Sequence, residues 1–301
     1  MKFKQIVALD DVNISEDAVR QISMISESEF IRFNSDSTTS AESVKRIGDA
    51  DCVLVSWRSP IDREVLTKCP NLRFICLCGT NSDSIDLDEA KKQDIVVSNI
   101  MDYGDEGVGE WVFSQLLILA RGLGKYQWKS SHAELANKTM GIIGLGAIGK
   151  LVADIALGFH MNVLYNSKTR KPEYEAKGLK YVGKKELLTN SDFITLQTPK
   201  NLKILTKEDF SFMNGKVLVN NTLGKPFEIE DIKEWIKGEN NFVIMDTCVS
   251  QDYHKELSNT KRVIFSDFIA GRTEESVVRL GDKTIKNLKA FLTNKPINQV
   301  N

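Results

Sequence analysis

Three glycines in the stretch 140–149 have the spacing that binds a dinucleotide. Gly144, Gly146 and Gly149 form Gly-x-Gly-x-x-Gly directly after an apolar run. The first glycine suits a tight strand-to-helix turn, the second lets a pyrophosphate approach the backbone, and the third lets the helix pack closely on the strand. A helix that begins here turns free N–H groups and its positive dipole end towards the phosphates. The residues expected to contact the cofactor at this turn are Gly144, Leu145, Gly146, Ala147, Ile148 and Gly149.

The sequence on both sides of the turn supplies the elements that position it. Residues 139–143 have the composition of a buried strand, and 161–165 has that of a second one. Between them Ile148, Val152 and Ile155 recur on one face of a helix. Strand, glycine turn, helix and strand follow in the order of a nucleotide-binding unit.

The position about 20 residues after the turn indicates which dinucleotide binds. In NAD-binding folds an acidic residue there accepts hydrogen bonds from the ribose hydroxyls, but this chain has Ser167. The run 165–171 has no carboxylate and three cations, which suits the 2′-phosphate of NADP, although a solvated cationic loop is the alternative. We therefore expect NADP(H) rather than NAD(H). This loop contributes Asn166, Ser167, Lys168, Thr169 and Arg170.

Composition limits the other classes of partner. The 301 residues include 40 basic and 41 acidic ones, and a net charge of −1 argues against nucleic acid or an anionic membrane. No basic N-terminal region is followed by an apolar one, and no apolar run approaches membrane-spanning length, so we expect neither a secretory leader nor a membrane span. Five cysteines without metal-ligand spacing indicate reduced thiols and a cytoplasmic protein. Cys76 and Cys78 lie on one face of an apolar strand, so we expect core side chains and no metal site.

Two series of strands alternating with helical patterns predict an α/β protein with two Rossmann-like, doubly wound parallel-sheet domains and a cleft between them. A strong helix over 105–120 separates the series, and a helix over 274–292 has no strand after it. The terminal helix is expected to return to the first domain, which gives domains of 1–104 plus 275–301 and of 105–274. The expected strands are 5–10, 51–56, 73–78 and 95–98 in the first series and 139–143, 161–165, 192–196, 216–220, 242–246 and 262–266 in the second.

The chain resembles the D-isomer-specific 2-hydroxyacid dehydrogenase family over nearly its whole length, and within it the NADP-preferring glyoxylate and hydroxypyruvate reductases. Segments 78–86, 108–111, 141–149, 219–224 and 269–273 carry the resemblance. It implies that the first domain is a flavodoxin-like substrate domain and that the second binds the cofactor. It also implies a substrate-carboxylate loop and further cofactor contacts. These are Gly79, Thr80 and Asn81 for the substrate and Thr198, Pro199, Thr222 and Asp246 for the cofactor.

The resemblance further implies a hydride transfer in which an Arg holds the substrate and a His backed by a Glu moves the proton. An Arg fork matches a carboxylate, and a His near neutral pKa exchanges a proton at pH 7. Carried over residue by residue, these positions are Leu223, Gln251 and Phe268, so all three groups are replaced. Possible substitutes nearby are Lys225, Asp252 and His254.

A missing general acid costs about 10²–10⁴ in rate, so reduction of an ordinary 2-keto acid should be very weak. Two alternatives remain open. In the first, the protein is an NADP-dependent reductase whose substrate is not a plain 2-keto acid but carries another reducible group, such as an iminium or a conjugated group. In the second, it is a non-catalytic protein that binds NADP(H) as a sensor or as the partner of another protein. The small-molecule substrate is unknown. Relatives are usually homodimers, and the helix 105–120 with Trp128 supplies either that contact or internal core.

Overall fold

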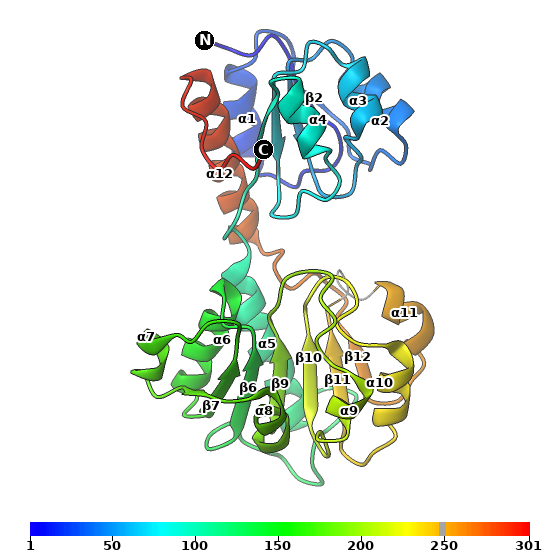
Figure 1. The fold of residues 1–301 in the computed structure, drawn as a ribbon, viewed down its shortest axis with the longest axis vertical. Coiled ribbons are helices and arrows are strands. Elements are labelled where there is room, and N and C mark those ends of the chain that lie inside the picture. Colours follow the sequence, from blue (N-terminus) through cyan, green and yellow to red (C-terminus); the bar gives the residue numbers. More distant parts are fainter. Residues whose placement is uncertain (247–250) are drawn as a thin grey trace. The chain divides into compact units, whose positions relative to one another are not determined.

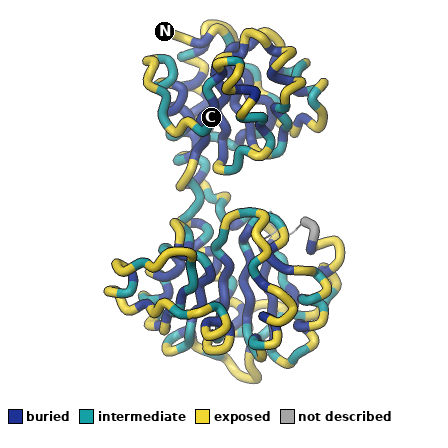
Figure 2. The backbone as a smooth tube through the Cα atoms, viewed as in Figure 1, coloured by how far each residue is buried: buried dark blue, intermediate teal, exposed yellow. Residues whose placement is uncertain are grey.

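The computed structural model describes residues 1–246 and 251–301. The chain divides into two compact units, Met1–Tyr103 with Glu274–Asn301 and Gly104–Thr273. These bounds differ by one residue at each junction from the expected ones. Each unit is a parallel sheet with buried strands and helices around it (Figures 1 and 2).

The first unit has a five-stranded parallel sheet in the order β2-β1-β3-β4-β5. This is the flavodoxin-like order 2-1-3-4-5. The four expected strands form, but the two-residue β2 was not expected because Ile31 and Arg32 make no apolar run. The elements are β1 (Ile6–Ala8), α1 (Glu16–Met24), β2 (Ile31–Arg32), α2 (Ser40–Ile47), β3 (Cys52–Val55), α3 (Arg63–Lys68), β4 (Phe74–Leu77), α4 (Leu87–Lys92), β5 (Val96–Ser98) and α12 (Glu274–Leu292).

The terminal helix α12 packs into the first unit, as expected. Its residues Leu280, Ile285 and Leu288 share one core with residues of the first hundred. Gly281 allows the close approach to α1, because a Cβ on it would lie 2.6 Å from the Cβ of Ala18. The first unit is therefore discontinuous in sequence.

The second unit has a seven-stranded parallel sheet in the order β12-β11-β10-β9-β6-β7-β8. Its first six strands in chain order follow the doubly wound order 3-2-1-4-5-6, and β12 extends that sheet. The sequence predicted six strands here and missed the exposed two-residue edge strand β8. The elements are α5 (Asp105–Arg121), β6 (Thr139–Ile143), α6 (Ala147–Gly158), β7 (Asn162–Asn166), α7 (Pro172–Glu175), β8 (Lys180–Tyr181), α8 (Lys184–Asn190), β9 (Phe193–Leu196), α9 (Lys207–Phe210), β10 (Val217–Asn220), α10 (Ile229–Trp235), β11 (Phe242–Met245), α11 (Gln251–Leu257) and β12 (Val263–Phe265).

Trp128 belongs to the core of the second unit. Its ring is 1% exposed, and its indole N–H donates to the Gly215 carbonyl at 3.2 Å. Of the two alternatives, contact or core, the structure shows core for Trp128, whereas Ile118 of helix α5 is 40% exposed. Among the residues that the structure describes, none of the helices combines the length and apolar character required to cross a bilayer.

Candidate dinucleotide site

The glycine turn has the geometry that its spacing predicts. Gly144 follows β6 with φ of +97°, in the region that favours glycine, and a Cβ there would lie 2.1 Å from the Gln197 carbonyl oxygen. A Cβ on Gly149 would lie 2.2 Å from the Gly144 carbonyl oxygen. Both positions therefore require glycine so that strand β6, helix α6 and the end of β9 can meet.

Gly146 leaves room for a ligand. A Cβ added to it would meet no atom within 4 Å in the described part of the chain. It is also the N-cap of α6, and no side chain of the described residues caps that helix end. The first N–H groups of a twelve-residue helix thus face open space, which fits a pyrophosphate.

The loop after β7 carries the cations expected for a 2′-phosphate. Lys168 and Thr169 are exposed, and the Ser167 hydroxyl donates to the Thr169 carbonyl. Arg170 does not extend freely from this loop, because its guanidinium pairs with the Glu175 carboxylate. Glu175 was not predicted from the sequence; it lies in the short helix α7, which has Pro172 in its first turn.

The ends of β9 and β10 carry a group of amides and hydroxyls. Gln197 and Asn221 exchange two hydrogen bonds of 2.8 and 3.0 Å between their amide groups. Asn220 is fully buried and its side-chain nitrogen has no partner in the described chain, nor has the hydroxyl of Thr198. Such unsatisfied donors at a strand end suit a bound polar group. Gln197 and Asn221 were not predicted as site residues from the sequence, because only the pairing of β9 with β10 brings them together.

The remaining expected cofactor residues are held by internal bonds. The hydroxyl of Thr222 donates to the Leu196 carbonyl at 2.8 Å. Asp246 is 4% exposed at the end of β11 and accepts the Ala270 N–H at 3.0 Å. Asn166 accepts the Gly144 N–H on its carbonyl at 2.8 Å, which ties the loop to the glycine turn. Pro199 is exposed at the end of β9, and its contact with a cofactor stays a prediction.

The resemblance assigns the positions of the catalytic groups to Leu223, Gln251 and Phe268, and that assignment stays a prediction. Leu223 is partly buried just after β10, and Phe268 is 58% exposed just after β12. The expected substitute His254 packs its ring against Phe265 at 4.8 Å between centroids, and Lys225 is exposed. Outside the described part of the chain lie Cys248 and the side chains of Gln251 and Asp252.

The expected substrate loop follows β4 in the first unit. Gly79 is buried, and its carbonyl accepts the Ile100 N–H at 3.0 Å. The hydroxyl of Thr80 donates to the Ile100 carbonyl at 3.2 Å, while the Asn81 side chain accepts the Asp83 N–H. The loop is thus anchored, and its contact with substrate stays a prediction.

Cys76 and Cys78 lie in the core of the first unit, as expected. They are 0% and 5% exposed. Hydrogen bonding with Cys76 and burial raise the pKa of the Cys78 thiol well above its ordinary value. The thiol is therefore a poor nucleophile and a poor metal ligand. No group of three metal-ligating side chains occurs in residues 1–246 and 251–301.

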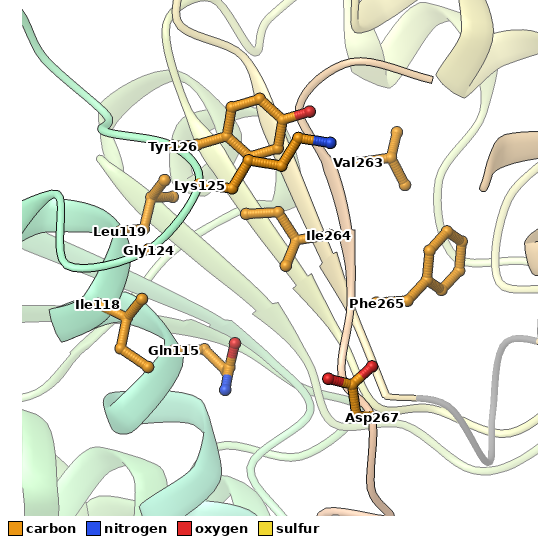
Figure 3. Close-up of a pocket in the computed structure, with 10 residues that line it drawn as sticks. All are labelled: Gln115, Ile118, Leu119, Gly124, Lys125, Tyr126, Val263, Ile264, Phe265 and Asp267. Atoms are coloured by element: carbon orange, nitrogen blue, oxygen red, sulfur yellow. The ribbon is translucent and has the colours of Figure 1, made fainter. Parts of the chain in front are cut away.

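A separate pocket of about 380 Å³ opens beside the edge strand β12 of the second unit (Figure 3). Its walls come from the end of α5, the following turn and β12. It contains neither the glycine turn nor positions 223 and 268. The lining residues are Gln115, Ile118, Leu119, Gly124, Lys125, Tyr126, Val263, Ile264, Phe265 and Asp267.

A flavodoxin-like unit and a Rossmann unit with an open glycine turn define a two-domain dinucleotide-binding protein. The family model for the D-isomer specific 2-hydroxyacid dehydrogenase, catalytic domain, matches residues 6–301. The chain therefore belongs to this family of NAD(P)-dependent dehydrogenases and reductases.

Two relatives with assigned names cover most of the chain. A hydroxypyruvate reductase of Blautia hydrogenotrophica is 32% identical over 287 residues, which are 88% of this chain and 89% of that protein. A glyoxylate reductase of Thermococcus litoralis is 30% identical over 292 residues, 86% of each.

Solved structures show the same fold. Apo D-lactate dehydrogenase from Escherichia coli superposes with a TM-score of 0.84 at 22% identity, with 99% of each chain covered. An acyclic imino acid reductase in complex with NADPH and D-Arg has a TM-score of 0.82 at 25% identity, covering 99% of this chain and 100% of that one.

Proposed function

We propose that this protein is an NADP(H)-dependent oxidoreductase that reduces a substrate other than a plain 2-keto acid. The proposal rests on a contrast, within the second unit, between the residues expected to bind the cofactor and those at the expected catalytic positions. The glycine turn is open at Gly146 and the following loop is cationic, whereas Leu223 and Phe268 stand where the family uses Arg and His. The cofactor site is thus preserved without the usual proton-transfer groups.

A protonated imine is the substrate class that we favour. Reduction of a ketone needs a proton on oxygen as the hydride arrives, so the loss of a general acid is costly. In a protonated imine the nitrogen already carries its proton. The hydride adds to carbon, the π-electron pair moves to nitrogen, and a neutral amine forms without a general acid. The similarity to an imino acid reductase supports this choice.

Each part of the second unit would have a defined role with the cofactor bound. Bound NADPH would supply the hydride. The N-terminus of α6 and the open face of Gly146 would hold the pyrophosphate, and Lys168 would face the 2′-phosphate. Leu223 and Phe268 would offer apolar surface and exchange no proton.

The experiment compares two substrate classes with one cofactor pair. We expect fluorescence titration to give tighter binding of NADPH than of NADH. We expect NADPH oxidation above about 1 s⁻¹ when glyoxylate or hydroxypyruvate is mixed with excess methylamine, and far less with the keto acid alone. Turnover of that size with the keto acid alone would refute the proposal. Tight NADPH binding without any turnover would favour a non-catalytic NADP(H) sensor.

We also propose that the protein forms a homodimer and that the two copies meet at the face that carries the β12 pocket. Lys125 and Asp267 lie at opposite ends of the pocket, with Ile118 and Ile264 between them (Figure 3). A two-fold axis through this face would pair the Lys125 of each copy with the Asp267 of the other. We expect Ile118→Glu to convert a dimer to a monomer in light scattering.

The matched control is Met24→Glu, which places the same charge on another exposed apolar residue, in the first unit. This variant should keep the dimer. A wild-type protein that is monomeric at micromolar concentration would contradict the proposal, and so would dimer loss in both variants.

A further inference from the structure

One carboxylate holds the loop after β7 to helix α7. The Glu175 oxygen Oε1 accepts from Arg170 Nε at 3.0 Å, and Oε2 accepts from a terminal guanidinium nitrogen of the same residue. The Tyr165 hydroxyl donates to Oε1 at 2.7 Å. The Arg170 and Tyr165 hydrogen bonds hold the pKa of Glu175 below its ordinary value, so the carboxylate is ionised at neutral pH.

Tyr165 extends this anchor into the backbone of the loop. Its side chain is fully buried, and its hydroxyl accepts the Lys171 N–H at 2.7 Å. At the other end of the loop the Asn166 amide donates to the Val182 carbonyl at 2.9 Å. Both ends of the loop are therefore fixed, and residues 167–169 project between them.

The hydrogen bonds of Glu175 with Arg170 and Tyr165, here called the anchor, leave some cations of the loop paired and others unpaired. The Arg170 guanidinium is occupied by Glu175 and lies 5.3 Å from the centroid of the Tyr181 ring. Lys150, which lies in helix α6 and not in the loop, pairs with Glu173 at 3.2 Å. Lys168 is exposed, and within residues 1–246 and 251–301 it makes no ion pair or hydrogen bond. Lys168 is thus the exposed cation of this loop that is available to an anion, whereas Lys171, the third cation of the loop, is partly buried.

We infer that Glu175 is a positioning residue that determines cofactor specificity, and that Arg170 acts through Glu175 rather than as a ligand of the phosphate. A bidentate Arg–carboxylate pair fixes the orientation of the two side chains as well as the distance between them. A lysine ammonium, which acts as a point charge, fixes only the distance. A loop fixed in advance loses less freedom when it binds the 2′-phosphate. The inference rests on the proposed preference for NADP(H).

The first test measures the NADPH-to-NADH affinity ratio by fluorescence titration. We expect Glu175→Gln to lower this ratio about tenfold, the effect of one charge-assisted hydrogen bond, and Lys168→Met to lower it by at least as much. The matched control is Glu173→Gln, which removes the same charge from the same short helix but leaves the anchor intact. It should change the ratio less than about twofold, because an exposed ion pair contributes little.

A double-mutant cycle separates an anchor from a phosphate ligand. Arg170→Lys keeps the positive charge and removes the planar fork. If Arg170 acts through Glu175, this variant should resemble Glu175→Gln, and the double variant should be no worse than either. An Arg170→Lys variant that keeps the wild-type ratio, or additive effects in the double variant, would overturn the inference.

Hydrogen exchange of the cofactor-free protein tests the anchor independently of NADP(H). The Lys171 amide, which is bonded to the Tyr165 hydroxyl, should exchange faster in Tyr165→Phe and Glu175→Gln than in wild type and Glu173→Gln, at equal melting temperatures. Unchanged exchange in Glu175→Gln would refute the anchor. If wild type binds both cofactors equally while this exchange pattern holds, the cofactor preference is wrong and the anchor stands.

Discussion

At the scale of single residues, a substitution at Gly146 is expected to weaken cofactor binding without affecting folding. A methyl group there meets no described atom, and the backbone φ of −85° suits alanine, so Gly146→Ala should fold normally. The methyl group would occupy the space of the pyrophosphate, and we expect NADPH affinity to fall at least about tenfold, or 1.4 kcal/mol. Gly158→Ala, on the same helix and also without nearby atoms, is the control that should change neither affinity nor melting temperature.

Gly149→Ala should behave differently. Its Cβ would lie 2.2 Å from the Gly144 carbonyl oxygen, so the helix must shift. We expect a loss of about 1–3 kcal/mol in unfolding free energy, measured by urea denaturation. A stable Gly149→Ala protein would show that the strand and helix pack less closely than described.

The proposed replacement of the catalytic residues can be tested by restoring the family's groups. We expect Leu223→Arg with Gln251→Glu and Phe268→His to raise glyoxylate reduction by about 10²–10⁴, the usual contribution of a general acid, while NADPH affinity changes little. Steady-state rates with NADPH would show the change. Leu223→Lys in the same background controls for charge without the fork of Arg. No gain from the triple variant would mean that more than these three groups separates this chain from its relatives.

At the scale of elements, helix α9 depends on a charged cap. Asp209 accepts from the Thr206 backbone N–H and from Lys184 Nζ at 2.7 Å. Burial alone would raise the pKa of Asp209, but the bonds from Lys184 and Thr206 outweigh it and lower the pKa. The stabilisation is therefore complete above the ordinary aspartate pKa of about 3.9 and is lost as pH falls through the lower folded-state value.

The corresponding variant is Asp209→Asn. We expect it to lose about 1–2 kcal/mol at pH 7 and to approach wild-type stability as the pH falls below about 4, measured by urea midpoints. Glu208→Gln, on the same helix but exposed, should follow the wild-type pH profile. A constant difference between Asp209→Asn and wild type at all pH values would contradict the ionic cap.

The sequence predicted the helices and strands whose apolar pattern extends over many residues and missed the two strands of only two residues. Helices 105–120 and 274–292 have many apolar positions and formed as expected at Asp105–Arg121 and Glu274–Leu292. Strands β2 and β8 have two residues each, and sheet pairing alone stabilises them. No local pattern marks such strands.

At the scale of the whole molecule, the two units differ in how their cores are built. Both hydrophobic cores of the second unit consist of residues from 104–273 alone. A core of the first unit joins residues such as Phe3 and Phe74 to Leu280 and Leu288 of α12. We expect the fragment 104–273 to fold and bind NADPH, and the fragment 1–103 to lack cooperative unfolding by circular dichroism. Cooperative folding of 1–103 would show that α12 is dispensable.

The sequence by itself determined the family and the glycine turn, because each depends on residue type and spacing along the chain, and the replacement of the usual catalytic groups stays a prediction. The site followed from Gly144, Gly146 and Gly149 in the same way, and the structure adds the clash distances that explain them. Only the tertiary structure decided that Trp128 is core and that Arg170 is held by Glu175. A cationic loop indicates charge, but which cation remains available depends on partners that packing brings to it.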